Sequence, residues 1–453
     1  MKLLLLLLCL VTAILHNVLN AQAANHYIRD GATGSPPCSD WATACDALPS
    51  TLVRGDTYYI ADGAYGAVKF NTGPQTGGAT ITIKKATTAD HGTDMGWDAT
   101  YGNGQATFIR WDFDTSNWTV DGVVRNENDW FDRSSYGFVV GTGGTQTNQI
   151  DLLNCPAVFH NIVIRHTAVR GYDSYASLPT GFDIGSYAIH SDSTGCTNQQ
   201  YTGLVFHRML VQGGVNQWLI RNTTGAIIEY SAAENAIGNE GNHGDAINLY
   251  YSVQNVIIRY NKFRHEYTTA CNFCGSTGIL PMCCGSNGAQ VYGNWVSDFR
   301  GGDGFMGYIG GTTSNNRIYN NTFDNCNAST GGNGGLNLGG TGNVAYNNIW
   351  INCMNIALVG VTHNYNAFGD SNPRGEGNAQ LNISTSIFMN YAAQDFRLKS
   401  TTMAGIVLAS PYNTDLLGTT RGWDGAWSRG ALEVVNGTAN LVPPAAPTSL
   451  KVQ

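Results

Sequence analysis

The residues with the most evident chemical potential lie close together between positions 240 and 250. Glu240, His243 and Asp245 are followed within five residues by Asn248 and Tyr250. An imidazole titrates near neutral pH and can accept a proton in catalysis, whereas carboxylate oxygens are ligands that Ca²⁺ prefers. The segment therefore predicts a proton acceptor beside an oxygen-rich cation site.

Arginine and aspartate side chains before and after this segment extend the candidate site. Arg221 precedes it, and Arg300 and Asp303 belong to a Gly-Asp-Gly turn that follows it. Removing the proton beside a sugar carboxylate needs a cation to neutralise the carboxylate and a base to take the proton. We therefore predict the catalytic residues His243, Asp245, Arg221, Asp303 and Arg300, and a calcium site formed by Glu240, Asp245 and Asp303. The alternative is that Gly-Asp-Gly turns are ordinary chain corners, in which the aspartate binds backbone amides.

The composition limits the class of protein that can carry such a site. Charged residues make up 12% of the 453 residues and glycine numbers 56, whereas charged residues are about 25% of an ordinary soluble domain. So few charges exclude a helical bundle, a coiled coil and an ordinary cytosolic α/β enzyme. The hydrophobic fraction of 42% supports a large core and excludes a disordered chain. The net charge of −8, without clusters of lysine and arginine, excludes nucleic acid as a partner, and we expect no nucleotide or organic cofactor.

Short strand-like segments recur along the chain and end in asparagine and an aromatic residue. Examples are the segments 255–263 (NVIIRYNKF), 316–323 (NRIYNNTF) and 343–350 (NVAYNNIW), and the last two align without gaps from Asn316 and Asn343. Each segment is too short to bury its own apolar face, so the segments should stack into one continuous core. The sequence predicts an all-β fold, in which one chain forms a solenoid with coils of about 27 to 30 residues.

A second family of strands precedes the first in each coil and recurs with a similar interval, as between positions 216 and 245. Period-two alternation places Trp218 with Ile220, and Ile247 with Leu249, toward the core. The alternate positions face outward along one sheet with Arg221, and we predict that they bind substrate: His190, Asp192, Asn248, Tyr250 and Tyr308.

The N-terminus predicts export. Lys2 is followed by an apolar run over residues 3–15 and by Ala21-Gln22-Ala23, the pattern of a secretory cleavage site. The run is too short to span a membrane. We expect a signal peptide at 1–23, a β-helix domain at 24–440 and a Pro-rich tail or linker at 441–453. The mature protein should be an extracellular monomer that does not insert into membranes.

Ten cysteines remain after removal of residues 1–23, an even number in an oxidising compartment. Cys326 and Cys353 are separated by the same interval as Asn316 and Asn343, which is one coil, so stacking should bring them within disulfide distance. We also pair Cys38 with Cys45 and Cys155 with Cys196. The remaining cysteines should staple a loop beside Asp245, although their spacing is also compatible with zinc: Cys271, Cys274, Cys283 and Cys284.

Three stretches resemble a known family. Residues 54–65 (RGDTYYIADGAY) are similar to the entry into the first coil, and residues 387–398 and 415–433 to the closing coils, of the right-handed parallel β-helix proteins of the pectate-lyase superfamily. The resemblance implies a single-stranded right-handed parallel β-helix with disulfide-stapled loops and a polysaccharide as partner. It specifies chemistry weakly, because this fold carries many functions.

The resemblance implies a secreted enzyme that degrades polysaccharide. A lyase that cleaves a uronate-containing polymer by β-elimination, with calcium, is favoured over a polygalacturonase-like hydrolase. Residues 243–263 are similar in layout to the calcium-and-lysine strand of chondroitinase B-like and alginate lyases, but aromatic residues around Tyr250 replace the expected lysine. The alternative from another class is a non-catalytic β-helix that binds glycans or forms a cell-surface structure.

Overall fold

The structure is a computed structural model that describes most of the chain. The described residues are 23–73, 78–141, 148–152, 158–171, 188–191, 200–236, 244–265, 277–281, 286–299, 306–307, 313–326 and 334–434. The expected signal peptide and the Pro-rich tail lie outside this range, apart from residue 23. Within it, no helix has the length and apolar character needed to cross a membrane.

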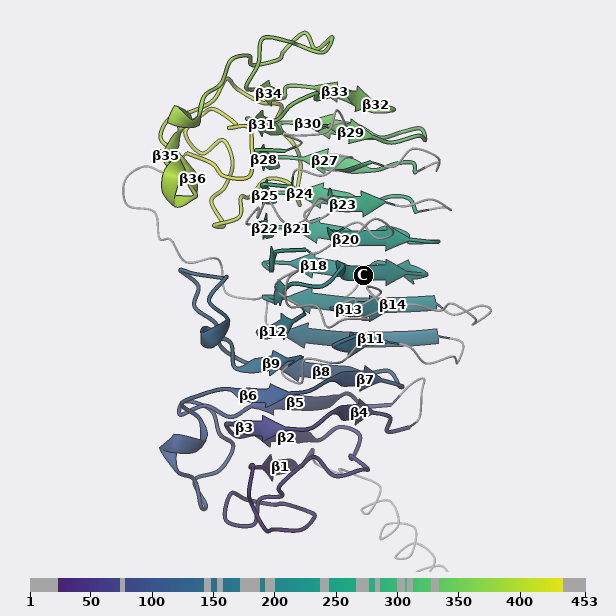
Figure 1. The fold of residues 1–453 in the computed structure, drawn as a ribbon, viewed down its shortest axis with the longest axis vertical. Helices are drawn as coiled ribbons and strands as arrows, with labels where there is room; N and C mark the ends of the chain where they lie inside the picture. The colour runs from purple at the N-terminus through teal and green to yellow at the C-terminus, as the bar shows by residue number, and fades with distance from the viewer. Residues whose placement is uncertain are drawn as a thin grey trace, which may run out of the picture.

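Three long parallel sheets form the body of the molecule, and their strands stack along its long axis (Figure 1). Sheet A contains β1 (Asn25–Ile28), β2 (Thr57–Ile60), β5 (Ile81–Lys85), β8 (Trp118–Asp121), β11 (Val158–Arg165), β14 (Gln200–His207), β18 (Ile227–Glu229), β21 (Ile257–Arg259), β24 (Gln290–Tyr292), β27 (Arg317–Tyr319), β30 (Val344–Tyr346) and β33 (Thr362–Asn364), with β17 (Thr223–Thr224) beside β14. Sheet B contains β3 (Gly63–Tyr65), β6 (Ala106–Phe108), β9 (Phe138–Val140), β12 (Thr167–Arg170), β15 (Leu210–Gln212), β19 (Ala232–Glu234), β22 (Lys262–Arg264), β25 (Trp295–Ser297), β28 (Thr322–Asp324), β31 (Ile349–Ile351) and β34 (Ala367–Phe368).

Sheet C contains β4 (Val68–Phe70), β7 (Trp111–Phe113), β10 (Ile150–Asp151), β13 (Ile189–Ser191), β16 (Asn216–Arg221), β20 (Asp245–Tyr250) and β23 (Thr277–Pro281). In the following coils its place is taken by β26 (Met306–Gly307), β29 (Leu336–Asn337) and β32 (Leu358–Val359). Short 3₁₀ helices occur at η1 (Ala99–Tyr101), η2 (Arg133–Ser135), η4 (Thr385–Ile387) and η5 (Tyr391–Ala393). Each coil therefore contributes one strand to sheet C, then sheet A, then sheet B.

This arrangement is the predicted parallel β-helix, and the predicted registers are confirmed. Arg317 pairs with Val344, and Trp218 pairs with Ile247, so in both cases the partners are one predicted coil apart. One apolar core runs through the inside of the stack from Ile28 to Phe368 and includes the inward residues of all three sheets. Stacking therefore solves the burial problem that single short strands cannot solve.

An asparagine ladder holds the turns between sheets A and B. Each turn has a left-handed residue, such as Asn320 with φ of 53°, followed by a buried asparagine. The ladder members are Asn261, Asn294, Asn321, Asn348 and Asn366. Asn321 accepts from the backbone N–H and the side-chain amide of Asn294, both at 3.0 Å. It donates to Asn348 Oδ1 at 3.0 Å and to the carbonyl of Val291 at 2.9 Å.

Two of the predicted disulfides are present. Cys326 and Cys353 are bonded across adjacent coils with their Cα atoms 4.5 Å apart, and Cys38 is bonded to Cys45. The other cysteines of the prediction lie outside the described residues: Cys155, Cys196, Cys271, Cys274, Cys283 and Cys284.

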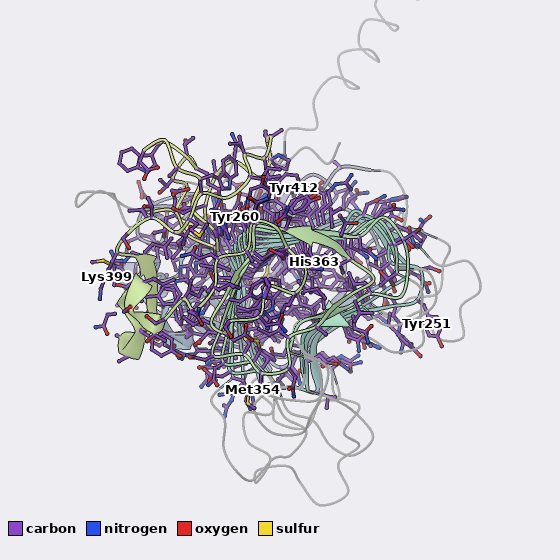
Figure 2. The ribbon with its side chains drawn as sticks, turned by 90° about the horizontal axis from the view of Figure 1, so that it is seen from above. Tyr251, Tyr260, Met354, His363, Lys399 and Tyr412 are labelled. Atoms are coloured by element: carbon purple, nitrogen blue, oxygen red, sulfur yellow. A yellow bond between two sulfur atoms is a disulfide. The ribbon has the colours of Figure 1, made fainter. Side chains whose placement is uncertain are left out.

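The expectation that residues 387–398 and 415–433 form closing coils is wrong. β35 (Phe388–Asn390) and β36 (Asp395–Leu398) pair antiparallel, and the chain then returns along the outside of the stack (Figure 1). We call residues 388–434 the C-terminal strap. Its Tyr412 lies beside Tyr260 (Figure 2) and makes edge contacts with Tyr292 and Tyr319 at ring-centroid distances of 4.9 and 4.8 Å. The strap covers outward-facing aromatic side chains that would otherwise form an exposed apolar patch.

The asparagine ladder predicts that loss of the side-chain amide of Asn321 strongly lowers the stability of the fold. Asn321→Ala should lower the free energy of unfolding by about 3 kcal/mol, because it leaves the donors of Asn294 and the acceptors of Asn348 and Val291 without partners away from water. Urea unfolding measures the loss. The control is Asn378→Ala, an exposed asparagine that should change stability by less than about 0.5 kcal/mol; equal stability of the two variants would contradict the role of the ladder.

Candidate functional site

The outer face of sheet C carries a row of side chains that crosses successive coils and is polar except at Leu219. We call it the sheet C row; its aligned members from β7 to β20 are Asp112, Asp151, His190, Leu219 and Asn248. The alternate residues Trp218 and Ile247 are in the core, as the sequence predicted. At about 4.8 Å per strand, the row is about 19 Å long. Four of its five members are at most 6% exposed: Asp151, His190, Leu219 and Asn248.

Asp151 is the centre of a hydrogen-bond network in this row. Its carboxylate lies 3.2 Å from His190 Nδ1 and accepts from Arg110 at 2.8 Å and from Asn148 at 3.1 Å. Arg110 also pairs with Asp112. Burial and the nearby charge of Asp151 raise the pKa of Asp112, although Arg110 opposes the rise. The Asn148 side-chain amide lies 3.1 Å from the same imidazole nitrogen, so Asp151 and Asn148 together fix the orientation of the His190 ring.

Arg221 and Tyr250 form the most open part of the described site. They are register neighbours at the ends of β16 and β20, and both are half-buried. The Arg221 guanidinium lies 4.3 Å from the centroid of the Tyr250 ring and 5.7 Å from that of Tyr251. The two tyrosine hydroxyls are 3.0 Å apart. A cation with adjacent aromatic rings can bind the carboxylate and the apolar face of an acidic sugar.

Asp245 lies at the opposite end of the same strand pair. It is 1% exposed and pairs in register with Asn216, whose Oδ1 accepts from Asn248 Nδ2 at 3.3 Å. Asp245 and Tyr250 are the first and last residues of β20, which sets them about 16 Å apart along an extended strand. Arg221 and Asp245 therefore do not meet at one point, because the register places them at opposite ends of β16 and β20.

The structure brings together part of the predicted set. His190 and Asn248 lie in one row, and Arg221 contacts Tyr250. Asp245 is the register partner of Asn216, to which Asn248 donates a hydrogen bond. His190 and Asn248 are more enclosed than outward-facing positions predict, at 6% and 4% exposure. The other predicted site residues lie outside the described residues: Asp192, Glu240, His243, Arg300, Asp303 and Tyr308. In the part of the chain that is described, no group of three or more His, Cys, Asp or Glu could hold a metal ion.

Several residues of the sheet C row escaped prediction. Asp112 and Asp151 each stand between two apolar residues in short strands, and Arg110 and Asn148 flank them. The signal was available, because the triplets at 111–113 and 150–152 have the same apolar–acid–apolar pattern in adjacent coils. The long segments between these coils concealed their common register.

Buried ion pairs form a second polar column on the outer face of sheet A. His207 Nδ1 lies 2.9 Å from Glu229 Oε1, and Arg259 donates to Glu229 Oε2 at 2.6 Å. Burial lowers the pKa of His207. Burial alone would raise the pKa of Glu229, but the contacts with His207 and Arg259 outweigh it and lower that pKa. The side chains of His207 and Glu229 are 0% and 1% exposed, so we assign this column to stability.

Comparisons with known proteins leave the chemistry open. No family model and no curated protein matches the sequence. Among solved structures, the chain is similar to the pectate lyase Pel9A, with a TM-score of 0.45 and 13% identity over 92% of this chain and 97% of that one. At this identity the likeness concerns the fold alone and does not extend to the residues of a site.

The buried column predicts acid sensitivity. The folded-state pKa values of His207 and Glu229 both lie below those of the unfolded chain, which therefore binds more protons as the pH falls. The free energy of unfolding should decrease as the pH falls from 7.5 to 4.5, about the range of the unfolded-chain pKa values. Glu229→Gln should be destabilising at pH 7.5, because it leaves the half-buried Arg259 without its charge partner.

The difference in the free energy of unfolding between this variant and the original protein should narrow toward pH 4.5, where the glutamate of the unfolded chain takes up a proton while Glu229, with its lowered pKa, stays ionised in the fold. Urea unfolding at a series of pH values measures it. The control is Asp424→Asn, at an exposed aspartate. Its free energy of unfolding should differ little from that of the original protein at every pH. If the difference in the free energy of unfolding between Glu229→Gln and the original protein stays constant with pH, the assignment of the sheet A column to stability is contradicted.

Proposed function

We propose that this protein is a secreted, monomeric polysaccharide lyase that cleaves a uronate-containing polymer by β-elimination. The observation that carries the proposal is the sheet C row with Arg221 and Tyr250 beside it. It combines a cation for the uronate carboxylate, an aromatic ring for the sugar face and an imidazole backed by a carboxylate. These groups lie along a line of coils, which suits a polymer.

The register supports a single sugar unit between His190 and Arg221. His190 pairs with Leu219, two residues before Arg221 on the neighbouring strand. From the spacing of parallel strands and the rise per residue, their Cα atoms are about 8 Å apart. A uronate unit can therefore contact both side chains at once.

In the proposed reaction, Arg221 binds the uronate carboxylate and makes the C5 proton more acidic. His190, oriented by Asp151, takes that proton as general base. The bond between C4 and the glycosidic oxygen breaks, the oxygen leaves with a proton from solvent, and a C4–C5 double bond forms. His243, the base predicted from the sequence, is the other imidazole to test.

Calcium belongs to the proposal as the second source of positive charge. Asp245, Asn216 and Asn248 supply one carboxylate and two amide side chains near one another. Oxygen donors of these types are those that Ca²⁺ takes, so the described residues fit part of such a site. A bound Ca²⁺ would neutralise a uronate carboxylate; Glu240 and Asp303 are the further ligands proposed from the sequence.

The cation–aromatic contact of Arg221 and Tyr250 also supports the alternative of a non-catalytic glycan-binding protein. Binding of a uronate polymer without release of any product would favour it. A polygalacturonase-like hydrolase would instead release reducing ends without an ultraviolet-absorbing double bond.

The test uses polygalacturonate, alginate and chondroitin sulfate, with ultraviolet absorbance of the unsaturated product as readout, in calcium and in chelator. We expect cleavage of one of these polymers. Arg221→Ala and His190→Ala should each lower the rate by at least about a hundredfold. The melting temperature should change little for the half-buried Arg221 and fall for the buried His190. Asp245→Asn should reduce the response to calcium.

The matched control is Arg317→Ala, which removes an exposed arginine on sheet A and should leave the rate unchanged. His243→Ala separates the two imidazoles. Absence of an unsaturated product from every polymer, or full activity of both Arg221→Ala and His190→Ala, would contradict the proposed lyase activity.

A further inference from the structure

A cavity of about 340 Å³ lies on the outer face of sheet B, between the β8–β9 loop (residues 122–137) and the C-terminal strap. Its aromatic and aliphatic walls include Trp130, Trp295, Phe396 and Leu416. Lys262 of β22 stands beside Trp295 of β25 in register, and both line the cavity. The volume is within the range of small-molecule sites and suits one or two sugar rings.

Acidic groups around this cavity are already engaged by arginines. Glu127 pairs with Arg125 and with Arg208, each at 2.9 Å. Asp395 accepts from Arg397 at 2.7 Å. The contacts with arginine lower the pKa of each acid against the opposing effect of burial, so both carboxylates are ionised and satisfied.

Lys262 differs from these groups. Its ammonium lies 4.2 Å from the centroid of the Trp130 ring, whose other close cation is Arg125 at 4.1 Å. Among the residues that the structure describes, none forms an ion pair or hydrogen bond with this ammonium. Burial, with a contribution from the charge of Arg125, lowers the pKa of Lys262 to about 8. The carboxylates of Glu127, Asp129 and Asp395 attract this ammonium from a distance, but none pairs with it directly, so an anionic ligand in contact with it would offset the cost of its burial.

We propose that this cavity is a binding site for a uronate monosaccharide, with its carboxylate on Lys262 and its ring against the aromatic wall. A uronate has the required combination of one carboxylate, an apolar C–H face and hydroxyls, which Asn128 and Gln394 at the cavity wall can meet. The proposal does not depend on the proposed lyase activity, because the cavity is on sheet B and the sheet C row is elsewhere.

The two sites lie on different sides of the stack. Tyr251 at the end of β20 and Lys399 after β36 project from opposite sides when the molecule is viewed along its long axis (Figure 2). One ligand cannot occupy both sites, so substitutions can address each site separately.

The test is calorimetric titration of the full chain with D-galacturonate and with D-galactose. We expect galacturonate to bind and galactose to bind at least tenfold more weakly. Lys262→Met should weaken galacturonate binding at least tenfold. Lys399→Met, at an exposed lysine, should leave it unchanged.

The pH provides a second readout. The charged groups facing Lys262 are Arg125, Glu127, Asp129, Asp395 and Arg397, and ordinary carboxylates and guanidiniums keep their charge between pH 7 and 9. Loss of the Lys262 proton over this range should weaken galacturonate binding about tenfold.

The melting temperature of Lys262→Met should not fall, because the substitution removes a costly buried charge; it therefore checks that the variant is folded. Equal binding of galactose, no binding of either sugar, or unchanged binding by folded Lys262→Met would overturn the proposal. So would loss of all galacturonate binding in Arg221→Ala, which would place the ligand on sheet C.

Discussion

The in-register hydrogen bonding of parallel strands from one coil to the next is the constraint on which the rest of this molecule depends. Because each strand lies directly over its equivalent, a residue type that occurs at one position meets the same position of the next coil. Asparagines then form the ladder from Asn261 to Asn366, and cysteines one coil apart form the bond between Cys326 and Cys353. The same rule places polar outward residues of sheet C in a row.

In such a fold, a ligand can bind only to an outer face that other parts of the chain do not cover. Sheet A is largely committed to buried ion pairs and stacked tyrosines, and sheet B is covered in part by the β8–β9 loop and the C-terminal strap. Sheet C carries the half-buried Arg221 and Tyr250. Its charged residues lie in two places: Arg110 with Asp112 and Asp151 at one end of the row, and Arg221 near the other.

The sequence was sufficient for those features that repeat with the coil. The pairing of Trp218 with Ile247 and the disulfide of Cys326 follow from spacing alone, because stacking converts an offset in sequence into a neighbour in space. The sequence did not predict where along a strand each site residue lies. Arg221 and Asp245 belong to adjacent coils, but the register sets them at opposite ends of their strands. Asp151 was missed because segments of unequal length hid its alignment with His190. The strap was mistaken for closing coils, since its contacts are with residues more than a hundred positions earlier, as for Thr414 with Tyr260, and no local pattern encodes such contacts.

The long sequence separation between the strap and the surface it covers has a consequence for biosynthesis. Coils pair with the preceding coil, a few dozen residues back, so the stack can grow as the chain emerges from the ribosome. The bond between Tyr260 and Thr414 closes a loop of 154 residues and cannot form until that later segment has been synthesised. During this interval, Tyr260, Tyr292 and Trp295 present an aromatic surface without its cover, and other nascent chains compete for it. A chain that terminates before residue 411 would therefore keep its stacked coils but would expose this aromatic surface permanently to other chains.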